Sequence, residues 1–339
     1  MKHSKFAVTA SADYLNQGLN ELQELDRSLK TAALFESGVA IIESELDKEA
    51  FISMIKKGGT IFIRHIHPVD YTEAVDREDF QEVISALKGY EGQIGHGEKV
   101  AVQIRKGKGD YSFSTADIKN RIDRILTEEF GAEPEVKKPG KIISILLDGG
   151  KCHIGLSTPE DNLSSWSGGM VHYRKSDDDI SRAKYKLMEA IEVFDIDMSR
   201  FGNALDLGAA PGGWSSVLLD YGIKVTAVDT GDMDKRLYEY PGFRFIKTNV
   251  SDMDLGGEIF DIMTSDVSWN PKNTARMINA AAAHLKDGGT AVVTLKLMGE
   301  KARKAIKEVT GIYREIFDII KVKQLFHNRD EVTLYLYKR

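Results

Sequence analysis

The stretch Asn203–Gly222, NALDLGAAPGGWSSVLLDYG, decides the fold of the C-terminal half of the chain. It opens as a short apolar run, which is typical of a buried strand, and closes as an apolar helix. The glycines between them permit a tight turn and a close approach of the backbone to a ligand. Their spacing is Gly-x-x-x-Gly-Gly rather than the Gly-x-Gly-x-x-Gly of dinucleotide-binding proteins, and Pro211 removes a backbone donor that a phosphate would use. The turn therefore favours a ligand without a pyrophosphate.

Short apolar strand patterns alternate with helix patterns throughout residues 181–339. This alternation predicts a parallel sheet with helices on both faces. We therefore expect the region to be an α/β domain with a Rossmann-like sheet. The expected strands are 203–208, 224–229, 243–248, 259–266 and 290–297.

The N-terminal half predicts two smaller α+β modules. Residues 1–70 show the order strand-helix-strand-strand-helix-strand, which is that of a ferredoxin-like module. Residues 71–165 form the second, in which Ser114 and Asp117 have the spacing of a helix capping box. Residues 166–180 are rich in Ser, Gly and Asp and are expected to be a linker. The expected elements are strand 5–11, helix 15–25, hairpin 31–44, helix 48–58 and strand 60–69, then helix 79–90, strand 99–107, helix 114–131 and hairpin 141–157.

The composition is that of an ordinary globular chain, with 339 residues, 42% hydrophobic and 29% charged. The single cysteine, Cys152, excludes a disulfide framework and a cysteine-built zinc site, and it favours a cytoplasmic protein. We expect no signal peptide and no membrane span, because no apolar run approaches the necessary length of about 18 residues. The net charge of −6 argues against a nucleic-acid partner, but residues 301–339 carry 10 Lys+Arg against 5 Asp+Glu. Local charge matters more than the total when a protein meets a polyanion.

Polar residues follow the ends of successive expected strands. Gly208 begins the turn after the first strand, and Asp229, Asn249 and Asp266 stand at the ends of the next three. The carboxyl ends of parallel strands meet at one edge of a sheet, which is the usual ligand site of such folds. At this edge Asp229 is placed to accept the hydroxyls of a nucleoside ribose, and Asn249 to read an adenine edge. The alternative is a glycine turn with ordinary helix caps and no ligand.

Several segments together resemble the FtsJ-like ribose 2′-O-methyltransferase family. DLGAAPGGW closely resembles the first motif of that family. Four further segments resemble the catalytic pattern of that family: SRAKYKL (181–187), TSDVSWNP (264–271), TLKLMGEK (294–301) and HNRDEVTL (327–334).

Other segments resemble one branch of the family, the RlmM type. Enzymes of this branch methylate a cytidine ribose in large-subunit ribosomal RNA and carry an N-terminal THUMP region. The segments are Val228–Met233, Leu295–Leu297 and Gln324–Thr333.

The resemblance implies a set of site residues and S-adenosylmethionine as the cofactor. Two positions depart from the family pattern. Many members have an acid where Asn249 stands, and the second lysine usually occupies the position of Thr294. Lys296 lies two residues further on and therefore on the same face of the strand. The implied cofactor contacts are Gly208, Gly212, Trp214, Asp229, Asn249 and Asp266, and the implied catalytic set is Lys186, Asp266, Lys296 and Glu331.

The two lysines suit the chemistry that the family performs. A sulfonium methyl group is already activated, so the reaction requires no metal, but a ribose hydroxyl is a poor nucleophile until its proton is removed. An isolated lysine is protonated at neutral pH. A second ammonium nearby disfavours the doubly charged state, so Lys186 and Lys296 are expected to lower one another's pKa, with Asp266 and Glu331 orienting them. The resemblance assigns Lys296 as the base; the spacing alone does not separate the two lysines.

Other readings remain open at this point. Lys186 is also compatible with a solvated helix face, and Glu331 with an edge hairpin in which it pairs only with Arg329. Among functions, RNA base N-methylation on the same scaffold is disfavoured, because the segment after Asp266 lacks an Asn-Pro-Pro-Tyr-like motif. A catalytically silent RNA-binding protein is disfavoured because all four catalytic positions are filled. The preferred partner is large-subunit ribosomal RNA, with no membrane and no metal.

Three further features have a structural and a functional interpretation. His65 and His67 alternate on one strand face, but no third metal ligand is evident. A basic cluster in the second module is either a solvated loop or an RNA contact. Two tryptophans either stack a base or pack internally. The cluster comprises Arg105, Lys106, Lys108, Lys137, Lys138 and Lys141, and the tryptophans are Trp166 and Trp269.

Overall fold

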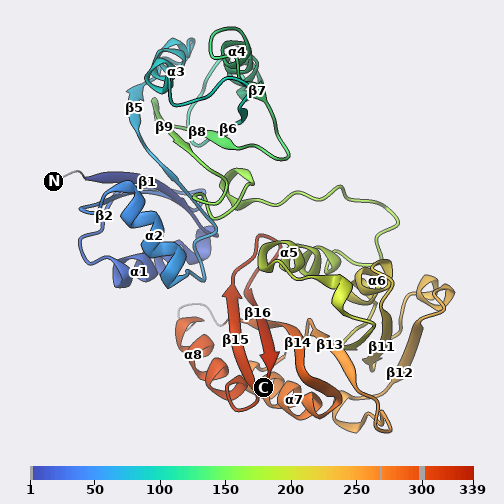
Figure 1. Cartoon of the computed structure of the whole chain (residues 1–339). Coiled ribbons are helices and arrows are strands. Elements are labelled where there is room, and N and C mark those ends of the chain that lie inside the picture. The colour runs from blue at the N-terminus through green and yellow to red at the C-terminus, as the bar shows by residue number, and fades with distance from the viewer. Residues whose placement is uncertain (1–2, 268, 298–301) are drawn as a thin grey trace. The chain divides into compact units, whose positions relative to one another are not determined.

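The computed structural model describes residues 3–267, 269–297 and 302–339, and it divides into two compact units, Met1–Met170 and Val171–Arg339 (Figure 1). Parts of the quoted segments 264–271 and 294–301 lie outside the described residues. The first unit contains two sheets with their own helices, and the second contains one large sheet. Among the described helices, none has the length and apolar character needed to cross a bilayer.

The first sheet of unit 1 has the expected ferredoxin-like order. It is antiparallel throughout, with the strand order β2-β3-β1-β4. The two helices pack on one face, where their apolar stripes join the buried side of the sheet in a single core. Along the chain the elements are β1 (Ser4–Thr9), α1 (Leu15–Leu25), β2 (Lys30–Phe35), β3 (Val39–Ser44), α2 (Lys48–Gly58) and β4 (His65–Pro68).

The strand expected over residues 60–69 is shorter in the structure. Only His65–Pro68 pair with β1, and the preceding residues form a buried loop. The carboxylate of Glu21, on α1, accepts the backbone N–H groups of Ile61 and Phe62 at 3.0 and 3.1 Å. These donors are satisfied by a side chain instead of a strand partner, so the apolar run predicted an extended strand where the tertiary fold makes a loop.

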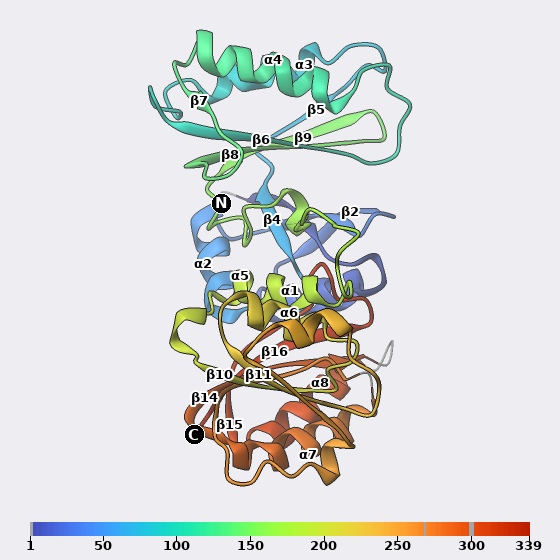
Figure 2. The same cartoon turned by 90° about the vertical axis from the view of Figure 1, so that its right-hand side faces the viewer.

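The second sheet of unit 1 has the order β5-β9-β8-β6-β7. Its helices α3 and α4 cover one face, as Figure 2 shows. The capping box is present: the Ser114 hydroxyl accepts the Asp117 N–H, and the Asp117 carboxylate accepts the Ser114 N–H. The elements are β5 (Tyr71–Ala74), which the sequence analysis missed, α3 (Gln81–Leu87), β6 (Lys99–Lys106), α4 (Thr115–Glu128), β7 (Glu133–Pro134), β8 (Lys141–Asp148) and β9 (Lys151–Ser157).

The two sheets of unit 1 share a small core of their own. Leu146 of β8 packs with Ala7, Ile41 and Val69 from the first sheet and its outgoing connection. Gly155 permits this closeness, because an added Cβ would lie 1.8 Å from the Pro68 carbonyl oxygen. The two modules therefore pack against each other as one compact unit and are not two domains joined by a free linker.

Unit 2 confirms the expected α/β domain with a Rossmann-like sheet. The strand order is β12-β11-β10-β13-β14-β16-β15. Helices α5 and α6 cover one face, and α7 and α8 the other (Figure 2). The elements are α5 (Lys184–Phe194), β10 (Asn203–Leu207), α6 (Gly213–Asp220), β11 (Lys224–Asp229), β12 (Phe243–Lys247), β13 (Phe260–Ser265), α7 (Pro271–Ala281), β14 (Leu285–Lys296), α8 (Ala302–Tyr313), β15 (Phe317–Lys323) and β16 (Glu331–Lys338).

The sheet of unit 2 differs from the expectation at its end. Its first five strands are parallel, but β16 runs antiparallel to both β14 and β15. The short connection between β15 and β16 forms a hairpin, which only an antiparallel pair can make. Glu331, the first residue of β16, lies in the hairpin at this edge of the sheet, on the inner of its two strands, because β15 takes the edge itself.

Candidate active site

A cleft opens where the carboxyl ends of the parallel strands of unit 2 meet. Its volume is about 390 Å³, and its lining includes four of the six cofactor contacts that the resemblance implies: Gly208, Asp229, Asn249 and Asp266. They come from the ends of β10, β11 and β13 and from the turn after β12, so the parallel topology alone makes neighbours of residues far apart in the chain. The lining residues are Gly208, Asp229, Thr230, Thr248, Asn249, Val250, Asp266, Val267, Trp269 and Met277.

Asp229 is held in a fixed orientation at this cleft. One carboxylate oxygen accepts the Gly231 N–H at 2.7 Å and the other accepts the Ala210 N–H at 3.0 Å. Each oxygen retains a lone pair for a second donor. The side chain is therefore ready to accept two hydroxyl groups without reorganising.

Two positions of the turn after β10 require glycine, because any larger side chain would clash with neighbouring residues. Both have positive φ, 69° at Gly208 and 113° at Gly212. An added Cβ on Gly208 would lie 2.2 Å from the side chain of Val267, and one on Gly212 would lie 2.2 Å from that of Leu237. Gly208 therefore lets the turns after β10 and β13 approach one another at the cleft, whereas Gly212 allows packing behind it.

Trp214 faces the interior of unit 2. Its side chain is 3% exposed and belongs to the core, and its indole N–H donates to the Ala183 carbonyl at 2.9 Å. The structure thus joins α6 to the segment that leads into α5 through this residue. It does not bring the indole or Gly212 among the residues that line the cleft.

A charged cluster adjoins the cleft at Asp266. The Lys186 ammonium donates to both Asp266 oxygens, at 3.0 and 3.1 Å, and lies 3.6 Å from a Glu331 oxygen. The Thr294 hydroxyl donates to Asp266 at 2.9 Å. All three charged side chains are less than one fifth exposed. Burial raises the pKa of Asp266, and the Lys186 ammonium acts in the opposite direction.

Lys296 occupies the last position of β14, and its side chain is exposed. It lies directly across the β14–β16 ladder from Glu331. Side chains at such a pair of positions stand on the same face of the sheet, with Cβ atoms about 5 Å apart. The structure therefore places Lys296 beside Glu331, while Lys186 is the lysine in contact with both carboxylates.

Asp206 is a buried acid that the sequence reasoning did not single out. It is 1% exposed in the middle of the apolar strand β10, and it accepts the hydroxyls of Ser215 and Thr264 at 2.6 and 2.8 Å. Burial raises its pKa to about 7, and the nearby charges of Asp266 and Asp229 add to that effect. A carboxylate inside an apolar strand was the available sequence signal, because charged residues are rarely buried without partners.

The histidines and the basic cluster of unit 1 take ordinary structural places. His65 and His67 are both buried, and burial lowers the pKa of each, that of His67 to about 4. No group of three metal-binding side chains occurs among the described residues. The basic residues predicted to cluster in the second module do not form a single patch. Lys141 begins β8 beside Val100, about 16 Å along the parallel strands from Arg105, and the mostly buried Arg105 guanidinium donates to Thr9.

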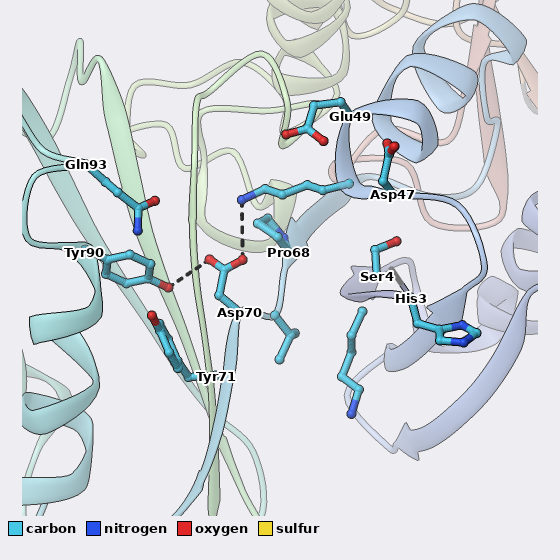
Figure 3. A pocket seen from close by; sticks show the side chains of 12 residues that line it. His3, Ser4, Asp47, Glu49, Pro68, Asp70, Tyr71, Tyr90 and Gln93 are labelled. Atoms are coloured by element: carbon cyan, nitrogen blue, oxygen red, sulfur yellow. Dashed lines mark hydrogen bonds and ion pairs between the residues drawn. The ribbon is translucent and has the colours of Figure 1, made fainter. Parts of the chain in front are cut away.

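Unit 1 has a cavity of its own, of about 480 Å³, between its two modules. Figure 3 shows Asp70 at its centre, between Tyr90 and the first turn of α2. The Asp70 carboxylate accepts the Tyr90 hydroxyl at 3.0 Å and the Leu156 N–H at 2.8 Å, and it lies 3.5 Å from the Lys48 ammonium. These contacts join both modules through one side chain.

With this geometry in place, comparison with known proteins assigns the class of the second unit. Residues 180–321 match the family model described as FtsJ-like methyltransferase. This stretch, which is similar to FtsJ-like methyltransferases, contains the cleft and most of the charged cluster.

Individual relatives sharpen the comparison. The chain is 34% identical to the ribosomal RNA large subunit methyltransferase M of Laribacter hongkongensis over 197 residues, which cover 50% of this chain and 51% of the relative. It is 30% identical to the protein of the same name from Psychromonas ingrahamii over 212 residues, 56% and 55% of the two chains. The match thus spans about half the length of these relatives. Among solved structures, TrmN from Thermus thermophilus is matched over the whole of both chains at 14% identity, with a TM-score of 0.39.

Proposed function

We propose that this protein is an S-adenosylmethionine-dependent RNA methyltransferase that acts on a ribose 2′-hydroxyl in large-subunit ribosomal RNA. The observation that carries the proposal is the Lys186–Asp266–Glu331 cluster, which adjoins the cleft of an FtsJ-like domain. Asp266 belongs to both, so a cofactor in the cleft and an acceptor at the cluster would meet at one side chain. The similarity to large subunit methyltransferases of ribosomal RNA supports the choice of substrate, and a cytidine is the proposed nucleotide.

The cleft fits an adenosine-containing cofactor without a pyrophosphate. Asp229 offers two oriented oxygens to the ribose hydroxyls, and Asn249, which also lines the cleft, supplies an amide for the adenine edge. Trp269, which is 55% exposed, and Met277 offer apolar surface to the adenine ring. When bound, S-adenosylmethionine supplies a methyl group on a positively charged sulfur. Gly212 and Trp214 would then support the cleft by packing, because neither is among the residues that line it.

The charged cluster supplies what the acceptor hydroxyl needs. Lys186, paired with two carboxylates, orients the acceptor and holds Asp266 and Glu331 in place. Lys296, exposed beside Glu331, takes the proton from the 2′-hydroxyl as the oxygen gains its methyl group. The hydroxyl proton would pass to the unprotonated Lys296 amine, and the oxygen–carbon bond formed would replace the carbon–sulfur bond of the methyl donor, whose sulfur would leave as a neutral thioether. This division keeps Lys296 as the base and gives Lys186 a positioning charge.

We also propose that unit 1 binds the RNA substrate. In this interpretation residues 1–70 are the ferredoxin-like module, 71–165 a THUMP-like RNA-binding domain, 166–180 the linker and 181–339 the methyltransferase. Cytoplasmic ribosomal RNA would be the partner. RNA affinity should fall steeply with salt, because phosphate contacts release counterions.

One experiment tests the assignment directly. The full-length protein is incubated with labelled S-adenosylmethionine and deproteinised ribosomal RNA from a strain that lacks the gene. We expect label in the large-subunit RNA and loss of alkaline cleavage at a single nucleotide, because a 2′-O-methyl group removes the attacking hydroxyl. Label without protection from alkali would indicate base methylation. Binding of the RNA without any label would indicate a silent RNA-binding protein.

A further inference from the structure

Helix α5 presents two charged residues on one face. Lys186 and Glu189 are three positions apart, and side chains at that spacing are neighbours on a helix surface. Lys186 contacts Asp266 and Glu331, as described above. Glu189 is 2% exposed and takes no part in that cluster. A carboxylate so deeply buried requires partners that satisfy its oxygens.

The partners of Glu189 all lie in the connection between β15 and β16. One carboxylate oxygen accepts the Phe326 N–H at 2.6 Å, and the other accepts the His327 N–H at 2.8 Å. The His327 ring nitrogen Nδ1 also lies 2.8 Å from the second oxygen. The imidazole stacks on Tyr173 and Tyr185, with ring centroids 5.5 and 5.4 Å apart. One buried side chain thus fixes two consecutive peptide groups and an imidazole against α5.

The rest of the connection transmits this anchoring to Glu331. Asn328 accepts the Leu325 N–H at 2.9 Å and the Thr333 hydroxyl at 3.1 Å, which ties the start of the connection to β16. The Glu331 carboxylate accepts the Arg329 N–H at 3.0 Å. The connection therefore has a defined shape from residue 325 to residue 333, and Glu331 lies four residues after the peptide group that Glu189 holds.

We infer that Glu189 is a positioning residue for methyl transfer, an inference that rests on the proposed function. It anchors the connection between β15 and β16 to the same helix that carries Lys186. Glu331 is thereby held 3.6 Å from the Lys186 ammonium and opposite Lys296. Glu189 touches neither the cleft nor the acceptor position, so it acts through Glu331 alone.

The test is Glu189→Gln, which keeps the size of the side chain and replaces one accepting oxygen by a donor. That NH₂ group would face an N–H group, so one anchor is lost. We expect single-turnover transfer to ribosomal RNA to slow by about 10- to 100-fold, because small misplacements at a reacting centre have effects of this size. The affinity for S-adenosylhomocysteine should not change. Glu315→Gln, at an exposed glutamate just before β15, is the matched control and should leave transfer unchanged.

A double-mutant cycle separates positioning from general damage to the fold. If Glu189 acts through Glu331, then Glu189→Gln in a Glu331→Gln background should cause less than about a twofold further loss. Losses that multiply would overturn the inference, as would a folded Glu189→Gln protein with normal transfer.

Hydrogen exchange provides a measurement that does not depend on activity. Exchange in residues 325–331 should accelerate in Glu189→Gln, while exchange in β10 and α6 stays as in the unchanged protein. If the unchanged protein transfers no methyl group, the proposed function is refuted, but the hydrogen-exchange result for residues 325–331 still stands. Unchanged exchange in residues 325–331 would instead refute the anchoring.

Discussion

Each unit pairs an aspartate that follows a strand with a lysine from the first turn of a helix, but the other partners of the two aspartates differ. In unit 1, Asp70 accepts a backbone N–H and a tyrosine hydroxyl in addition to its contact with Lys48. In unit 2, the partners of the Asp266 carboxylate among the described residues are the side chains of Lys186 and Thr294. A backbone partner ties a carboxylate to the fold, whereas side-chain partners can shift when a ligand arrives. Asp70 therefore has the environment of a structural joint, and Asp266 that of a reaction site.

The largest effect should follow from Lys296→Ala. If Lys296 is the base, single-turnover transfer should fall by about 10²- to 10⁴-fold, the usual contribution of a positioned base. Binding of S-adenosylhomocysteine should hardly change, because Lys296 is not among the residues that line the cleft. Lys186→Ala should also reduce transfer severely, because it removes the ammonium that pairs with Asp266 and Glu331. A folded Lys296→Ala protein that keeps most of its transfer rate would reject this mechanism.

The next effect concerns the buried Asp206 and the pH dependence of stability. Its folded-state pKa is about 7, above the ordinary 3.8, so the folded protein keeps a proton that the unfolded chain releases. The free energy of unfolding should therefore fall as the pH rises from about 4 to about 7. At about 1.4 kcal/mol per pKa unit the contribution reaches roughly 4 kcal/mol.

Asp206→Asn should remove this slope, so the variant should gain stability relative to the unchanged protein at pH 8. Chemical denaturation between pH 4.5 and 8 measures the difference, and exposed Asp252→Asn serves as the control. Parallel pH profiles for the Asp206 variant and the unchanged protein would contradict the assignment of a protonated buried acid.

A smaller effect is expected at Asp229. Asp229→Ala removes the two oxygens that are oriented toward the cleft, and it should weaken S-adenosylhomocysteine binding by about 1–3 kcal/mol, the cost of unpaired hydrogen-bonding groups. Calorimetry measures this directly. Exposed Asp232→Ala, three residues along, controls for the change of charge. Equal affinities of the Asp229 variant and the unchanged protein would sink the assignment of the cleft.

The smallest effect should come from Asp70→Asn, which tests the other side of the comparison. The change weakens the contact with Lys48 and replaces one acceptor, so unit 1 should lose about 1 kcal/mol of unfolding free energy. Cofactor binding by unit 2 should be unaffected. Melting curves with and without S-adenosylhomocysteine report the two units separately. A large loss of cofactor affinity would show that Asp70 does more than hold the two modules of unit 1 together.

The sequence predicted element types far better than element partners. Helices 15–25 and 48–58 were predicted with the bounds that the structure shows, because their apolar residues repeat at helical spacing between clear end signals. The strand over 60–69 was predicted too long, because only His65–Pro68 pair with β1, and the basic residues of the second module do not form one patch. Whether an apolar run becomes a strand, and which lysines share a surface, depends on neighbours that local spacing does not encode. The roles assigned to the site residues stay predictions until they are measured.

What the sequence by itself determined is local: the turn after β10, the polar residues at successive strand ends and the motifs of an FtsJ-like domain. Parallel strands bring their carboxyl ends to one edge, so these residues meet by topology. Only the tertiary structure decided that Lys186 contacts Asp266, 80 residues away, and that Glu189 holds Phe326, 137 residues away. It also decided that Trp214 packs inside and that β16 is an interior strand. Such contacts depend on how helices and hairpins pack on the sheet. The local periodicity of the sequence does not determine them, because the residues in contact are far apart in the chain.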